Sequence, residues 1–191
     1  MRRDAAVIAL MVALAASSMP AAAALLTLGE PERQEALRTG ERSVTSEVFG
    51  EEWRIVHGSG ESVTVFTPFH RLALAARHAA FKKEPLKPQD QARLLEELKD
   101  RLVFWVDLHG PREDFARHLR PRLLAGTREI EPSLVQNDRT ALRRRNGSYL
   151  ARCQYAFPTK DLSGTARVTL VVRDAEGQAV ARFPIDLSRM R

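Results

Sequence analysis

Three runs of alternating apolar and polar residues in the last quarter of this 191-residue chain constrain its fold more than any other feature. They occupy residues 149–157, 166–173 and 178–187, and a period of two residues is typical of a β-strand that buries one face. Between the last two runs, Asp174-Ala175-Glu176-Gly177 is typical of a four-residue hairpin turn. Three consecutive antiparallel strands with one apolar face each need a second sheet to cover them, so the pattern predicts a β-sandwich.

Every second residue of these runs is expected to face the core. The set comprises Tyr149, Ala151, Cys153, Tyr155, Phe157, Ala166, Val168, Leu170, Val172, Ala179, Ala181, Phe183, Ile185 and Leu187. Cys153 therefore lies on an apolar face, where a cysteine behaves as a small hydrophobe and not as a nucleophile. Because it is the single cysteine of the chain, an intrachain disulfide and a CxxC metal site are both excluded.

Two β regions are expected earlier in the chain. Residues 53–57 and 62–66 alternate with a period of two and are joined by a glycine-containing loop, which predicts a β-hairpin. Residues 102–108 are apolar at nearly every position, with Val103 and Trp105 on the face opposite the main apolar one. A strand that is apolar on both faces is expected to be covered on both sides.

Helical periodicity separates these two β regions. Thr67-Pro68 predicts an N-cap followed by proline at the first helical position, and a second helix is expected at about 88–100. Together they form a predicted helical hairpin at about 68–100. We expect this hairpin to pack on the face that carries Val103 and Trp105 and to bury the Trp105 indole. The two helices are too short to be stable alone in water, and Val103 and Trp105 would otherwise form an exposed apolar patch.

The region after residue 110 is ambiguous. Residues 111–124 fit either a helix that begins at Pro111 or an edge strand, and Pro121 favours the strand because proline breaks a helix interior. A turn at 125–128 and a short return strand at 130–135 are expected to follow.

Two local signals complete the pattern. Residues 30–39 predict a short helix, with Pro31 in its first turn and Gly40 after its end. Asn146-Gly147 predicts a two-residue hairpin turn.

The first 24 residues carry the pattern of a signal peptide. A basic start and the apolar stretch at 5–16 precede small residues, and cleavage after Ala23 or Ala24 fits a signal-peptidase site. We therefore expect a periplasmic or secreted protein whose mature chain, 25–191, is a single β-sandwich domain with a helical insertion. An uncleaved membrane anchor is the alternative, because residues 5–26 are about long enough to span a bilayer.

The stretches ARCQYAFP and GTARVTLVVRDAEGQAVARFPIDL resemble the final three strands of an immunoglobulin-like or fibronectin-type sandwich. With TPFHRLALAARHAA ahead of LVFWVDLHG, the chain as a whole resembles uncharacterised exported bacterial proteins. The resemblance implies a mainly β fold with an α insertion, namely an immunoglobulin-like antiparallel β-sandwich with a helical hairpin packed on one face. It implies no activity, because unrelated functions share such folds.

Charge is distributed unevenly along the chain. Residues 25–108 carry 12 Lys and Arg against 14 Asp and Glu, a net charge of −2, whereas residues 109–191 carry 16 against 9, a net charge of +7. Excess positive charge favours an anionic partner. For an exported protein we expect an anionic envelope component or another envelope protein, and no nucleic acid.

The densest positive cluster is Arg143, Arg144 and Arg145, directly before the Asn146-Gly147 turn. Three guanidinium groups at a hairpin tip can bind phosphate or carboxylate groups in bidentate fashion, which makes them candidate binding residues. The alternative is a solvated tip that keeps a sheet edge from aggregating. Two further arginines lie nearby in the sequence, Arg139 and Arg152.

The sequence contains no recognisable catalytic or metal-binding set. No HxH, HxxxH or HExxH spacing occurs among the five histidines, which are His57, His70, His78, His109 and His118. Ser59 lies between two glycines but lacks the G-x-S-x-G spacing of a nucleophile elbow. We therefore expect no catalytic residue, no metal and no cofactor.

Two functional hypotheses follow. The first is an exported, non-enzymatic binding or interaction domain of the cell envelope. The second is a hydrolase or metal-dependent enzyme whose site is assembled from distant residues near the helical insertion, around His57, His70 or His109. A pocket with converging histidine and carboxylate groups would favour the enzyme, and a flat or basic surface would favour the binding domain.

Overall fold

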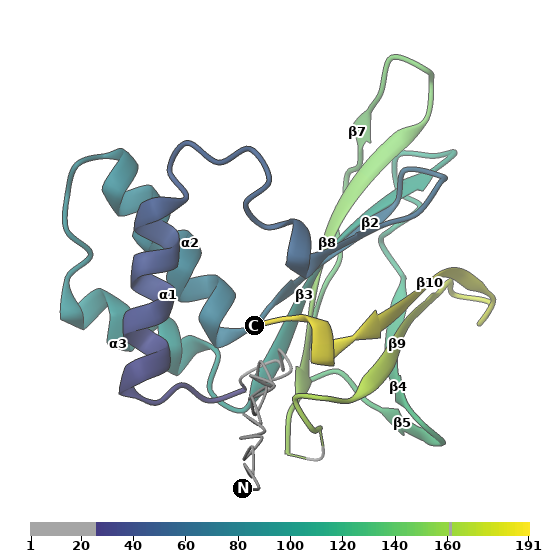
Figure 1. Cartoon of the computed structure of the whole chain (residues 1–191). Helices are drawn as coiled ribbons and strands as arrows, with labels where there is room; N and C mark the ends of the chain where they lie inside the picture. The colour runs from purple at the N-terminus through teal and green to yellow at the C-terminus, as the bar shows by residue number, and fades with distance from the viewer. Residues whose placement is uncertain (1–25, 161) are drawn as a thin grey trace, which may run out of the picture.

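The computed structural model describes residues 26–160 and 162–191 (Figure 1). The expected signal peptide, residues 1–24, lies outside the described residues. Within the described residues the chain forms two antiparallel sheets and three α-helices, which confirms a mainly β fold with an α component. No helix in this part of the chain combines the length and apolar character that a membrane crossing requires.

The first sheet is built around two long central strands. Its strands follow the order β1-β2-β3-β8-β6, with β7 also paired to β8. β3 and β8 pair over their full length, from Arg101 opposite Pro158 to Gly110 opposite Tyr149. The strand bounds are β1 (Arg54–Val56), β2 (Ser62–Phe66), β3 (Arg101–Gly110), β6 (Leu134–Gln136), β7 (Leu142–Arg143) and β8 (Tyr149–Pro158).

The second sheet has four strands in the order β10-β9-β4-β5. The expected turn at Asp174 to Gly177 joins β9 to β10: Gly177 has a φ of 85°, and its amide donates to the Asp174 carbonyl at 3.2 Å. The strand bounds are β4 (Arg120–Ala125), β5 (Arg128–Ile130), β9 (Arg167–Arg173) and β10 (Ala179–Asp186).

The alternation in the last quarter of the chain identifies the buried faces correctly. Of the residues expected to face inward, Tyr149 and Ala166 are half-buried, Ala179 is exposed, and all others are buried in one core shared by the two sheets. The expectation of three consecutive neighbouring strands is wrong, because β8 pairs with β3 in the first sheet while β9 and β10 belong to the second. Alternation specifies which face is buried, but it does not specify the neighbouring strand.

The three α-helices lie together on one side of the sheets (Figure 1). α1 (Glu30–Arg42) packs closely on α2 (Pro68–Phe81), and α3 (Pro88–Glu97) follows. Gly40 lies inside α1 and not after its end, since a Cβ atom there would come within 2.1 Å of the Ala73 carbonyl oxygen of α2. The missing side chain is what lets the two helices approach.

The ambiguous region 111–124 resolves into turns followed by β4 (Arg120–Ala125). Pro121 pairs only with Val172 of β9, because β5 reaches no further than Leu123 on the other side of β4. Proline is therefore accommodated where no second neighbour needs its amide. The expected single return strand is wrong: β5 pairs in the second sheet and β6 in the first.

The outer face of the first sheet is only partly covered by helices. Val103 is 8% exposed and packs with Leu74 of α2 and with Leu98, which directly follows α3. Trp105, however, is 40% exposed, so the expectation that the helical hairpin buries it is wrong. Trp105 lies two residues further along β3, about 7 Å from Val103 at roughly 3.3 Å per residue, and the helical cover ends before it.

Candidate functional site

The hairpin between β7 and β8 carries the arginines singled out from the sequence. The Arg144 amide donates to the Ser148 carbonyl at 2.8 Å, the Gly147 amide donates to the Arg144 carbonyl at 3.1 Å, and Gly147 has a φ of 84°. The hairpin therefore turns at Asn146-Gly147 as expected, but the expected two-residue turn is wrong, because three residues, 145–147, connect the paired Arg144 and Ser148. The hairpin projects beyond the rest of the first sheet (Figure 1).

The guanidinium groups of Arg143, Arg144 and Arg145 have no hydrogen bond or ion pair within the described residues, and all three residues are exposed. Leu142, next to them, is 66% exposed. We call Leu142 to Arg145 the arginine tip. Such a tip presents three bidentate donors and an apolar side chain together, which suits an anionic group at an apolar boundary.

The two neighbouring arginines have different surroundings from the arginine tip. The Arg152 guanidinium donates to Asp107 at 2.9 Å across β8 and β3. Arg139 is exposed, and its carbonyl accepts a hydrogen bond from the Arg117 side chain. The Arg152 guanidinium is therefore compensated, whereas the Arg139 guanidinium, like those of the arginine tip, has no partner within the described residues.

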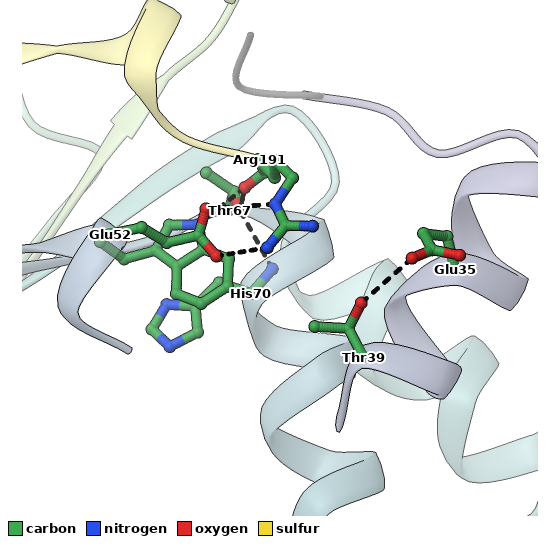
Figure 2. Close-up of polar contacts among 7 residues, drawn as sticks. Glu35, Thr39, Glu52, Thr67, His70 and Arg191 are labelled. Atoms are coloured by element: carbon green, nitrogen blue, oxygen red, sulfur yellow. Dashed lines mark hydrogen bonds and ion pairs between the residues drawn. The ribbon is translucent and has the colours of Figure 1, made fainter. Parts of the chain in front are cut away.

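A second polar cluster lies where the last residue of the chain meets α2 (Figure 2). The Arg191 carbonyl accepts hydrogen bonds from the Trp53 indole at 2.8 Å and from the Thr67 hydroxyl at 2.5 Å. The Arg191 guanidinium makes two hydrogen bonds to Glu52, at 2.8 and 3.1 Å, and lies 5.3 Å from the centre of the Phe69 ring. Hydrogen bonding to Glu52 raises the pKa of Arg191. We call Glu52, Trp53, Thr67, His70 and Arg191 the junction.

His70 is the buried histidine of the junction. Its ring stacks on Trp53 on one side, with centroids 4.2 Å apart, and on Phe66 on the other, 4.8 Å apart. Its Nδ1 lies 2.9 Å from the Val65 carbonyl oxygen, so a neutral ring donates from Nδ1. Burial lowers the pKa of His70 to about 4, and the ring is neutral at pH 7.

The junction fixes structure and does not present a reactive group. Thr67 also caps α2, because its hydroxyl oxygen accepts a hydrogen bond from the His70 amide. The Thr67 hydroxyl, the Trp53 indole N–H and the Arg191 carbonyl all have partners, and the Trp53 and Phe66 rings stack on His70. Sequence reasoning missed this cluster because Glu52 and Arg191 lie 139 positions apart.

The other histidines of the enzyme hypothesis are not gathered with His70. His57 stacks on Phe183, with centroids 4.6 Å apart, and Ser59 donates to Glu61 at 3.4 Å in the β1–β2 loop. His109 lines a pocket of about 370 Å³. Residues of the β9–β10 turn form part of the wall of this pocket.

The His109 pocket also receives His118 and several carboxylates. Glu61, Asp114 and Glu176 line it together with the two histidines. Within the described residues no three such side chains stand in a metal-binding arrangement, and neither imidazole ring is held by a hydrogen bond. The pocket therefore gathers titratable groups whose imidazole rings are not oriented by hydrogen bonds within the described residues.

Cys153 is fully buried in the core between the sheets, as the sequence predicts. Burial raises the pKa of its thiol. A raised pKa is the opposite of what a thiolate nucleophile needs, so this cysteine packs the core.

The structure adds one surface that the sequence did not reveal. A groove of about 200 Å³ lies over the outer face of the first sheet, where Phe66, Trp105 and Leu134 meet Arg71 and Arg101. The apolar character of residues 102–108 on both faces was the available signal. It indicated a cover for Trp105, but it did not show that the helices would stop short.

Comparisons with known proteins assign no family. No family model matches the chain, and no curated protein matches it. Among solved structures, the chain is similar to a protein of unknown function from Burkholderia pseudomallei, with 12% sequence identity and a TM-score of 0.43 over 85% of this chain and 91% of that chain. A likeness at this level assigns no function.

Proposed function

We propose that this protein is an exported, non-enzymatic binding domain of the cell envelope that attaches to an anionic, phosphate-bearing envelope component through the arginine tip. The observation that carries the proposal is the set of three exposed guanidinium groups without partners among the described residues, on a hairpin that projects from the sheet. Arginine is the side chain best suited to bidentate recognition of phosphate.

Two further features support this proposal, and a third concerns the fold. Residues 109–191 carry a net charge of +7, so the approach of an anion to this half of the molecule is favoured. The signal-peptide pattern at residues 1–24 supports export to the periplasm or beyond, with an uncleaved anchor as the alternative. Two antiparallel sheets with a shared core are compatible with an immunoglobulin-like sandwich, which we propose as the finer fold class.

Binding to lipid vesicles tests the arginine tip directly. The purified protein is sedimented with phosphatidylcholine vesicles with and without phosphatidylglycerol, and in a parallel arm with lipopolysaccharide. We expect binding only where a lipid with a net negative charge, phosphatidylglycerol or lipopolysaccharide, is present. Replacement of Arg143, Arg144 and Arg145 by Gln should weaken it about a hundredfold, because each arginine near a charged surface contributes roughly 1 kcal/mol.

A matched control separates the tip from overall charge. The triple variant R33Q/R93Q/R182Q removes the same charge from exposed positions elsewhere and should bind almost as tightly as the original chain. Equal losses in the two triple variants would show attraction to net charge alone. Unchanged binding after loss of the tip arginines would contradict the proposal.

A hydrolase is the second candidate function, and the His109 pocket is the observation that favours it. The pocket holds two histidines and several carboxylates, which is the constellation an acid–base site would use. Ester and phosphoester turnover that disappears in H109A and H118A, with binding to vesicles unchanged, would show an enzymatic site separate from the arginine tip and would contradict the non-enzymatic part of the proposal.

A further inference from the structure

The groove over the outer face of the first sheet is an incomplete apolar cluster. Phe66, Val103 and Ala156 are buried, and they pack with Leu98 and Leu74 from the helical side. On the other side, the cluster has no helical cover. There Trp105 and Leu134 are 40% and 39% exposed, and both line the groove.

The aromatic wall of the groove is held in place from behind. The Phe66 ring lies 5.3 Å from the Trp105 ring and stacks on the buried His70 ring at 4.8 Å. His70 in turn stacks on Trp53 in the core. A wall supported by packed rings costs little to order on binding, which is the condition for a preformed site.

The charges at the groove favour an acidic partner. Arg71 of α2 and Arg101 of β3 line it, together with Glu97 at the end of α3. Within the described residues none of these three side chains has a hydrogen bond or an ion pair. The local balance is therefore two positive charges against one negative charge, beside an exposed aromatic ring.

The size of the groove restricts its occupant. At about 200 Å³ it is smaller than the roughly 300–1,000 Å³ of a pocket for a small molecule or cofactor. It can take one bulky side chain whose backbone stays at the surface, as in the recognition of a short peptide segment.

We propose that this groove binds an extended segment of a partner protein that carries one bulky apolar side chain and, close to it in sequence, an acidic residue. The apolar side chain lies against Trp105 and Leu134 and completes the cluster. The carboxylate faces Arg71 and Arg101, where a bidentate guanidinium–carboxylate pair can form. This inference is independent of the arginine tip, which lies on a different element.

Selection from a library of random dodecapeptides displayed on phage tests the groove with the purified protein as bait. We expect the enriched sequences to combine an aromatic or large aliphatic residue with Asp or Glu a few positions away. A synthetic peptide of that consensus should change the tryptophan fluorescence, because Trp105 is 40% exposed whereas Trp53, the other tryptophan, is 1% exposed.

Variants of the groove decide the outcome. W105A and the charge reversal R71E/R101E should each weaken binding of the consensus peptide about tenfold or more. The matched controls F81A and R93E/R182E, at exposed positions elsewhere, should not. W105F keeps a ring at the wall and should retain most of the affinity, which guards against a W105A chain that folds poorly.

Three results would overturn the proposal: a basic or purely polar consensus, no enrichment, or full affinity in W105A. The variant with Gln at Arg143, Arg144 and Arg145 should bind the consensus peptide normally. The two proposals can therefore be tested separately. Peptide binding at the groove can be absent while vesicle binding through the arginine tip is present, and the reverse is equally possible.

Discussion

Arginine has two different environments in the junction and in the arginine tip. The Arg191 guanidinium donates hydrogen bonds to Glu52 and lies over the Phe69 ring. The backbone carbonyl of Arg191 accepts hydrogen bonds from Trp53 and Thr67. The guanidinium groups at 143–145 have neither an ion pair nor a cation–π contact among the described residues. The same residue type therefore stabilises the fold in one place and stays available to an outside anion in the other.

The difference predicts opposite responses to mutation. Loss of a junction group leaves buried partners unsatisfied and should lower the free energy of unfolding. Loss of a tip arginine removes a solvated charge, so it should change binding and leave stability nearly unchanged. Four measurements of stability test this contrast, and they are ordered here from the largest expected effect to the smallest.

Trp53→Ala should have the largest effect. Trp53 is 1% exposed, stacks on His70 and donates to the Arg191 carbonyl, so its loss should cost about 3–5 kcal/mol in urea unfolding followed by circular dichroism. Trp105→Ala is the natural comparison and should cost only about 1–2 kcal/mol because the ring is partly exposed. An equal loss in the free energy of unfolding for Trp53→Ala and Trp105→Ala would contradict the claim that the junction stabilises the fold more than the groove does.

Acidification should destabilise the junction through His70. Burial lowers its folded pKa to about 4, against about 6.5 in the unfolded chain. The hydrogen bond to Val65 and the charge of Glu52 oppose this shift, and Arg71 adds to it. The unfolded state therefore binds more protons between these values, so stability should fall by about 3 kcal/mol as pH drops from 6.5 to 4.

The variant His70→Asn checks the source of this pH dependence. An Asn side chain can still donate to the Val65 carbonyl but does not titrate, so the stability curve over that interval should become flatter. His118→Asn, at an exposed position, should leave the curve as it was. An unaltered slope in His70→Asn would place the titrating group elsewhere.

Thr67→Ala should cost about 1–2 kcal/mol, because it removes the N-cap of α2 and the hydrogen bond to Arg191. Thr67→Ser retains the hydroxyl and should recover most of the loss. Thermal unfolding of the three chains measures both effects. Stability in Thr67→Ala equal to that of the original chain would mean that water replaces the hydroxyl at little cost.

Replacement of all three tip arginines by Gln should have the smallest effect on stability. We expect a change within about 0.5 kcal/mol in urea unfolding, because the side chains are exposed and without partners. A cost comparable to that of Thr67→Ala would show that the tip serves the fold. The contrast with the junction would then disappear.

Predictions from the sequence were correct where the interacting residues lie close to each other along the chain. Thr67 and Pro68 begin α2, Asn146-Gly147 turns the hairpin, and the alternation around Cys153 identifies a buried face. The arginine tip could also be located, since a turn places its neighbours at an exposed end. These features depend on residues within a few positions of each other.

The sequence by itself determined most of the helices and strands, the buried faces and the exposed arginines, because backbone geometry and side-chain period act locally. Only the tertiary structure decided that β8 and β9 belong to different sheets, that Arg191 meets Trp53 and Thr67, and that Trp105 stays partly uncovered. The physical reason is that pairing and cover depend on which distant segments reach each other. In Trp105 the deciding factor is where the helical cover ends, about two residues short of the ring.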